Sequence, residues 1–415
     1  MRQPPNIQKR LVISGYCGTI PAIGWSTDCE IKQENMVETM EKTRKPRIAI
    51  LGDFPIGKVY SRYAERTKFY PTWLYCLYEA FFLKDEFDVH WIIVNKMIEE
   101  EEKIQVRNQT FHLIPGSRLT LGLYTAYVCN RYKVRKCVEK IQPDIFHGWG
   151  TERFYGLAAK DFRGKSLLSV QGLLNAYSKR APLSSFECRQ KWYEKGVLRN
   201  VKYITVESPW AWDRVLELAP NANLSLCEYA VNPDFYSVQR RLSDSPSCLI
   251  ACSRARVKNI QLAVKAFSRP ELRHVKLYMA GARPTDYSDL SQNIIPLGGV
   301  EHKKVAELMA SAWCLVHPSL ADTGPTVVKE ARVLGVAVVV TSECGSKQHV
   351  IHGKSGYVVP SNDEQRLIEA VLEVTKSRET ALQMGEYGKE ECRRALCVET
   401  MSRTFSELYK KILAD

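Results

Sequence analysis

Short apolar runs alternate with amphipathic stretches along most of this 415-residue chain. In the first half, the apolar runs predict six strands, over residues 47–54, 89–94, 144–149, 166–172, 203–208 and 226–230. Apolar residues between these runs recur at helical spacing, most clearly over residues 121–141. Apolar strands separated by helices are typical of a parallel sheet that is covered on both faces.

The same alternation begins again after residues 237–247, a polar stretch that is the best linker candidate. We expect strands over residues 248–253, 275–282, 293–297, 314–319, 336–341 and 356–360. We expect helices over residues 259–268, 301–312, 326–334 and 363–375, and a charged helical stretch over 379–413. The predicted fold class is therefore α/β, with two doubly wound parallel-sheet (Rossmann-like) domains that face a cleft.

This pattern divides the chain into five parts. Residues 1–45 show no regular pattern and are expected to form a poorly ordered extension. Residues 46–236 and 248–395 are the two predicted domains, joined by the linker at residues 237–247. Residues 396–415 are predicted to form a C-terminal helix that packs back on the first domain. The acidic run at residues 99–102 indicates a solvated loop.

Charge and cysteines narrow the class of protein. The formal net charge of +13 favours an anionic partner, such as nucleic acid, an anionic membrane or a phosphate-bearing substrate, or else is only a soluble basic surface. The 13 cysteines contain no CxxC pair, which disfavours a zinc site, and their odd number favours reduced thiols in the cytoplasm. No segment reaches the ~18 apolar residues that span a bilayer, and the first residues lack signal-peptide order, so any membrane contact is expected to be peripheral.

The most informative segment runs from residue 317 to residue 335, and contains two acids, Asp322 and Glu330. A strand is expected to end at Ser319, and a helix to start near Thr326 after a turn that contains Gly324 and Pro325. The free amides at the start of a helix suit a phosphate or a polar sugar. The alternative is that Asp322 caps the helix and Glu330 is a surface charge.

This segment resembles the acidic signature of the GT-B glycosyltransferases of family 4, in which seven residues separate two acids. Residues 335–345, 353–360 and 362–363 resemble the same family, and the resemblance covers roughly residues 46–395. It implies that Glu330 holds the ribose of a nucleotide-sugar donor and that Asp322 binds the transferred sugar. The backbone amides around Gly324 and Thr326 would help to hold the sugar or the phosphate. Pro325 replaces the family's usual glycine, however, and has no amide to donate.

The resemblance also implies a basic pair on the donor diphosphate, for which Arg254 and Lys258 are the candidates. Their spacing is one residue short of the usual pattern, so Arg256 is expected to share the role. Two fixed cations would stabilise the charge on the leaving group without a metal. The alternative is a basic solvated turn. Gly299 and Val300 would pack against the nucleobase.

Three residues of the first domain are candidates for the acceptor side of the cleft. Gly57 ends a strand-to-loop segment that lacks the P-loop spacing of an NTPase. Gln171 stands where many family members have a histidine, and a glutamine binds a hydroxyl but cannot act as a base. His147 either lines the cleft or is a satisfied histidine at the end of a strand.

The resulting hypothesis is a cytoplasmic glycosyltransferase that retains the anomeric configuration. Its expected partners are a nucleotide-sugar donor and a glycan or lipid-linked acceptor, in cell-surface polysaccharide or glycoconjugate biosynthesis. Peripheral contact with the anionic inner face of a membrane is expected, but no cofactor, metal or nucleic acid. The alternatives are a GT-B sugar-nucleotide epimerase or hydrolase, or a non-catalytic two-domain binding protein. A dinucleotide dehydrogenase is disfavoured because no GxGxxG follows a strand.

Overall fold

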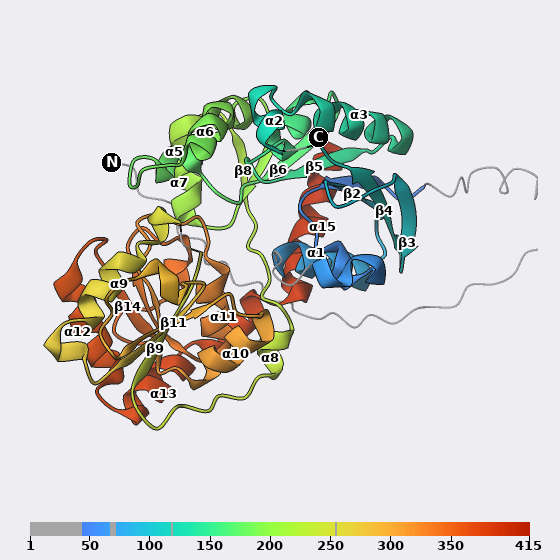
Figure 1. The fold of residues 1–415 in the computed structure, drawn as a ribbon. Coiled ribbons are helices and arrows are strands. Elements are labelled where there is room, and N and C mark those ends of the chain that lie inside the picture. The colour runs from blue at the N-terminus through green and yellow to red at the C-terminus, as the bar shows by residue number, and fades with distance from the viewer. Residues whose placement is uncertain (1–43, 67–71, 118, 254) are drawn as a thin grey trace, which may run out of the picture. The chain divides into compact units, whose positions relative to one another are not determined.

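Two sheets organise the chain in a computed structural model that describes residues 44–66, 72–117, 119–253 and 255–415 (Figure 1). The predicted extension at residues 1–45 therefore lies almost wholly outside the described residues. Lys45–Asp415 form one unit that holds both sheets. None of the described helices is both long and apolar enough to cross a bilayer.

The first sheet has eight strands in the order β3-β4-β2-β1-β5-β6-β7-β8. All neighbours pair in parallel except β3 and β4. The strands are β1 (Arg47–Leu51), β2 (Asp88–Asn95), β3 (Glu102–Val106), β4 (Gln109–Pro115), β5 (Ile145–Trp149), β6 (Lys165–Ser169), β7 (Tyr203–Val206) and β8 (Asn223–Leu226). The helices of this half are α1 (Thr72–Leu83), α2 (Leu119–Tyr124), α3 (Val128–Ile141), α4 (Tyr155–Asp161), α5 (Leu174–Tyr177), α6 (Ser185–Leu198), α7 (Pro209–Leu218) and α8 (Asp234–Ser237).

The second sheet has six parallel strands in the order β11-β10-β9-β12-β13-β14. They are β9 (Ser247–Ala251), β10 (Lys276–Ala280), β11 (Ile294–Gly298), β12 (Cys314–His317), β13 (Ala337–Thr341) and β14 (Gly356–Val359). The helices that follow are α9 (Ile260–Phe267), α10 (His302–Ser311), α11 (Thr326–Leu334), α12 (Glu364–Thr375), α13 (Arg378–Glu386), α14 (Lys389–Ala395) and α15 (Val398–Ala414). These two parallel-sheet α/β domains confirm the predicted fold class.

Apolar cores lie on both faces of each sheet. The last helix, α15, belongs to the core of the first sheet, where Figure 1 shows it in red beside the blue α1. Tyr409 of α15 stacks on Phe81 with ring centroids 5.7 Å apart, and the Ser402 hydroxyl donates to the Ala80 carbonyl at 2.8 Å. The chain therefore crosses between the two sheets twice, before β9 and again before α15.

The structure corrects four of the expected elements. The acidic run at residues 99–102 leads into an antiparallel edge strand, β3, which was missed because only alternate residues of it are partly buried. The strand expected over residues 226–230 ends at Leu226 instead. The helix expected over 121–141 is broken by the left-handed backbone of Ala126 and Tyr127, and the stretch at 379–413 forms three helices.

Candidate active site

The carboxylate of Asp322 lies in the loop after β12, buried between the loops that follow β9 and β13. Its Oδ2 atom accepts from Lys258 Nζ at 2.5 Å and lies 2.9 Å from His317 Nε2. Its backbone pairs with the loop after β13, because its amide donates to the Glu343 carbonyl and its carbonyl accepts from the Gly345 amide. The structure therefore brings together Asp322 and Lys258, which the sequence placed in different motifs.

Charge pairing holds Asp322 ionised. Burial alone would raise its pKa, but the Lys258 ammonium and the His317 hydrogen bond bring the pKa well below its ordinary value. Burial opposes the charge on Lys258, yet Asp322 outweighs it and raises the pKa of the lysine. The result is a fixed anion and cation at the carboxyl ends of neighbouring strands.

His317 is a residue of this site to which no role was assigned from the sequence. Its Nε2 atom lies 2.9 Å both from Asp322 and from the Ser319 hydroxyl, and burial lowers its pKa although Asp322 opposes this. A histidine five residues before an acid at the end of a strand was the available signal. The ring orients the Asp322 carboxylate.

Glu330 lies on α11, which begins at Thr326 and ends where Gly335 takes a left-handed backbone conformation (φ 78°). The side chain is buried, with the residue only 5% exposed, and no described group forms a hydrogen bond or ion pair with its carboxylate. Burial raises its pKa to about 7, although Lys329 opposes this. The alternative interpretation is therefore wrong, because Glu330 is not a surface charge and Asp322 does not cap α11.

The remaining second-domain candidates differ in how far they are buried. Gly324 is buried, and Thr326 is the half-buried first residue of α11. Gly299 is exposed and Val300 half-buried, both just after β11, and Arg256 is exposed in the short turn before α9. Arg254 lies outside the described residues, so its role stays a prediction.

Gln171 follows β6 in the first domain and contacts the acid loop of the second. Its backbone carbonyl accepts from the Thr323 hydroxyl at 2.5 Å, one residue from Asp322. Its side-chain Nε2 atom is buried and has no hydrogen-bond partner among the described residues.

Two other first-domain candidates are placed differently. His147 is fully buried in β5, with Nδ1 2.8 Å from the Tyr409 hydroxyl and Nε2 2.7 Å from the Ser169 hydroxyl. This corrects its assignment as a cleft residue in favour of the satisfied histidine, because neither ring nitrogen is free. Gly57 lies half-buried in a short turn at Ile56–Lys58, and no described contact joins it to the acid pair.

A buried ion pair joins the two domains beside the acids. Lys329 Nζ of α11 lies 2.6 Å from Glu207 Oε2, which follows β7, and both side chains are almost fully buried. The same ammonium donates to the Tyr229 carbonyl at 3.1 Å. A β-carbon on Gly324 would lie 2.7 Å from the Glu207 carboxyl carbon, so a larger residue there would have to displace the paired Glu207 carboxylate.

A further carboxylate, that of Glu152, was not singled out from the sequence. It lies against Gly150 and Gly172 in the loops after β5 and β6, next to Gln171. Burial raises its pKa to about 7, and the nearby Glu194 adds to the shift. The described residues contain no group of three or more His, Cys, Asp or Glu side chains that could hold a metal ion.

Comparison with known proteins agrees with this arrangement. Residues 237–391 match the family model described as glycosyl transferases group 1. Over 184 aligned residues, which make up 42% of this chain, the sequence is 26% identical to the N-acetyl-alpha-D-glucosaminyl L-malate synthase of Bacillus anthracis. The match spans about half of that relative's length, 48%.

Solved structures share the fold over nearly the whole chain. Sucrose-phosphate synthase from Thermosynechococcus elongatus has a TM-score of 0.70 at 17% identity, covering 89% of this chain and 99% of the other. HepE from Anabaena, in complex with UDP and glucose, has a TM-score of 0.63 at 12% identity, covering 88% and 100%. The second domain therefore matches the group 1 glycosyl transferases over residues 237–391, and the chain shares the two-domain GT-B fold of these solved structures.

Proposed function

We propose that this protein transfers a sugar from a nucleotide-sugar donor to a glycan or lipid-linked acceptor, with retention, in cell-surface polysaccharide or glycoconjugate biosynthesis. The observation that carries the proposal is Glu330, a buried carboxylate without a partner in the described chain. A buried carboxylate normally has hydrogen-bond donors around it. The missing donors are supplied by a ligand diol, and the ribose of a nucleotide has one.

Asp322 and Lys258 act on the sugar and the diphosphate. Both described contacts of the Asp322 carboxylate use Oδ2, which leaves Oδ1 for a hydroxyl of the transferred sugar. Lys258 carries the positive charge that a leaving nucleoside diphosphate needs, with Arg256 and Arg254 as its helpers. HepE, of the same fold, was solved with UDP and glucose.

The transfer proceeds with retention when the acceptor oxygen is positioned on the same face of the sugar as the leaving phosphate. The bond from the anomeric carbon to the phosphate oxygen breaks, and the acceptor oxygen bonds to that carbon from the same face. The acceptor proton passes to the departing phosphate oxygen, so no protein base is needed. Gln171, which cannot act as a base, binds a hydroxyl through its unpaired Nε2 atom.

We further propose that the protein works in the cytoplasm, without a metal or other cofactor, in peripheral contact with the anionic inner face of a membrane. The net charge of +13 supports the contact, and the free thiols of the described cysteines support a reducing compartment.

The test is release of nucleoside diphosphate from a panel of UDP-, GDP- and ADP-sugars, with thermal shifts by the free nucleotides alongside. We expect slow release from one donor, and its loss in Glu330→Gln. Glu307→Gln, an exposed glutamate of α10, is the matched control and keeps the release.

Three results would contradict the proposal. Release in Glu330→Gln at the parent rate would remove the donor site from α11. Turnover of the donor as fast without acceptor as with it would indicate the hydrolase or epimerase. A nucleotide shift without turnover of any donor, in the presence of acceptor glycans, would indicate a binding protein.

A further inference from the structure

Large apolar side chains are exposed together on one outer face of the first domain. Tyr124 at the end of α2 is 69% exposed, Val128 and Tyr132 at the start of α3 are 54% and 53% exposed, and Trp192 on α6 is 77% exposed. Helix α2 contacts both α3 and α6, and Figure 1 shows the three helices in a row. We call these four side chains and the exposed cations around them the α2–α3–α6 face.

The cations of this face alternate with its aromatic rings. The Arg189 guanidinium of α6 lies 4.2 Å from the centroid of the Tyr124 ring, and that of Arg135 lies 5.5 Å from the Tyr132 ring. The exposed basic residues on α3 and α6 are Arg135, Lys136, Lys140, Arg189 and Lys195, and Glu139 is the one exposed acid on the described surface of the two helices. Glu139 pairs with Arg135 and Lys136, and Glu101 pairs with Lys140, so the face is apolar and keeps a net positive charge.

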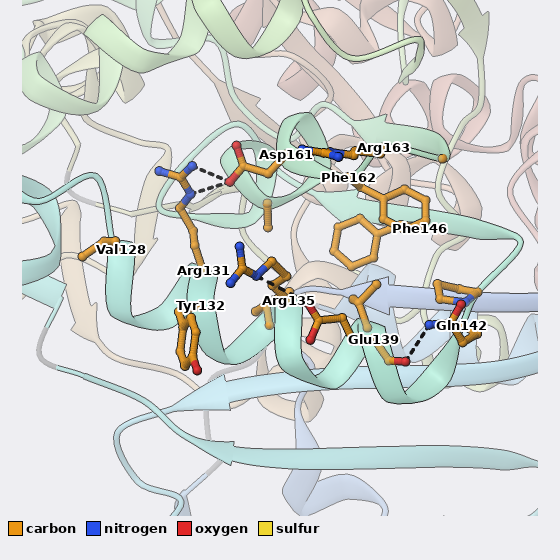
Figure 2. A pocket seen from close by; sticks show the side chains of 15 residues that line it. Val128, Arg131, Tyr132, Arg135, Glu139, Gln142, Phe146, Asp161, Phe162 and Arg163 are labelled. Atoms are coloured by element: carbon orange, nitrogen blue, oxygen red, sulfur yellow. Dashed lines mark hydrogen bonds and ion pairs between the residues drawn. The ribbon is translucent and has the colours of Figure 1, made fainter.

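A hollow of about 700 Å³ opens beside the face, between α3 and α4 (Figure 2). Its apolar wall includes Phe146 and Phe162, whose rings lie 5.5 Å apart. Arginines line it as well, and Figure 2 shows Arg131 paired with Asp161, with Arg163 near Phe162. Apolar walls with guanidinium groups beside them suit an acyl chain that ends in a phosphate.

The internal packing of α3 does not require this outer face. The opposite side of the helix buries Val134, Cys137, Val138 and Ile141 in the core. An outward side that only meets water is ordinarily polar, and contiguous exposed apolar patches mark interaction sites. Tyrosine and tryptophan among lysines and arginines are the side chains that settle at the headgroup level of a membrane.

We propose that the α2–α3–α6 face docks on an anionic phospholipid bilayer. Tyr132 and Trp192 enter the headgroup region, while the cations of α3 and α6 pair with lipid phosphates. A second copy of this chain fits the face poorly, because a symmetric contact would bring its cations against one another. The inference rests on the membrane contact proposed above and names its surface, but it does not depend on the transferase assignment.

The test is co-sedimentation of the full chain with phosphatidylcholine vesicles that contain either no phosphatidylglycerol or three-tenths of it. We expect binding only to the anionic vesicles. Tyr132→Ser with Trp192→Ser should weaken that binding about tenfold, since two buried aromatic side chains are lost. Arg135→Glu with Arg189→Glu should weaken it more than tenfold, because each cation near the surface contributes to the attraction.

Matched controls use exposed residues of the same kinds elsewhere on the chain. Phe82→Ser with Tyr387→Ser, which lie on α1 and just after α13, should leave binding unchanged, as should Lys276→Glu with Lys304→Glu. Because all these side chains are exposed, each variant is expected to keep the parent melting temperature. Donor hydrolysis should also be unchanged in the face variants, which separates this inference from the proposed activity.

Three outcomes would overturn the inference. One is the absence of binding to anionic vesicles. Another is that the control variants lose as much binding as the face variants, or that no variant loses binding. Either result would indicate adsorption through net charge alone. The third is a drop in molecular mass in solution for Tyr132→Ser with Trp192→Ser, which would indicate that the face joins two copies of the chain.

Discussion

Removing the ammonium of Lys329 should destabilise the protein strongly, and more so at high pH. Lys329→Met keeps most of the buried aliphatic chain but leaves Glu207, 2.6 Å away in the other domain, without its cation. Breaking a buried pair in this way costs about 3–5 kcal/mol. Burial raises the pKa of Glu207 to about 7 even though Lys329 opposes this.

The direction of the pH effect follows from that pKa. Glu207 holds its proton in the folded state up to about pH 7, whereas it loses the proton near the ordinary glutamate pKa of 4.5 when unfolded. At pH 5.5 the carboxyl is neutral in the parent and in Lys329→Met, so the loss should be small. At pH 8.5 only the parent offers the carboxylate a partner, so the full loss should be seen.

Urea unfolding at the two pH values measures this loss, followed by circular dichroism. The double variant Lys329→Met with Glu207→Gln should recover most of the stability, because no buried charge remains. Lys304→Met is the control, since Lys304 and Glu307 form an exposed pair at 3.0 Å worth about 0.3–0.5 kcal/mol. A loss below about 1 kcal/mol at pH 8.5, or no recovery in the double variant, would refute the reasoning.

Three further predictions concern the acid loop and α11. Glu330→Gln should flatten the pH dependence of the melting temperature between pH 5.5 and 8.5, because the parent loses stability as pH rises through the pKa of about 7; an unchanged slope would contradict this. Asp322→Asn should lower the melting temperature, because Lys258 loses its buried partner, and should lower donor hydrolysis about 100-fold when assayed well below that melting temperature; activity near that of the parent would exclude the role. Gly345→Ala should lower the free energy of unfolding in urea by about 1–3 kcal/mol, since its β-carbon would lie 1.8 Å from the Thr323 carbonyl oxygen. Gly196→Ala, in α6 with open space around it, should raise the free energy of unfolding by about 0.5–1 kcal/mol.

Periodicity alone predicted both parallel sheets and located eleven of their strands to within a few residues. Strands that are buried on both faces, such as β5 and β13, are continuous apolar runs, and these are visible without any partner. The edge strand β3 was missed because an edge is half solvated, and its sequence is then close to that of a loop. Its neighbour β4 was missed as well although it is largely buried, because Gln109, Thr110 and His112 interrupt its apolar run. The break between α2 and α3 depends on Ala126 and Tyr127, neither of which signals a left-handed backbone.

The sequence by itself determined the fold class and the two acids, because both depend on residues close together along the chain. Only the tertiary structure paired Lys258 with Asp322 and brought Lys329 against Glu207, 122 positions away. It also showed that His147 is a core residue and that the Glu330 carboxylate is buried and unpaired in the described chain. These facts concern contacts between loops at the ends of different strands and side chains on different elements. Strand order and packing set such contacts, and neither is written in the local pattern of apolar and polar residues.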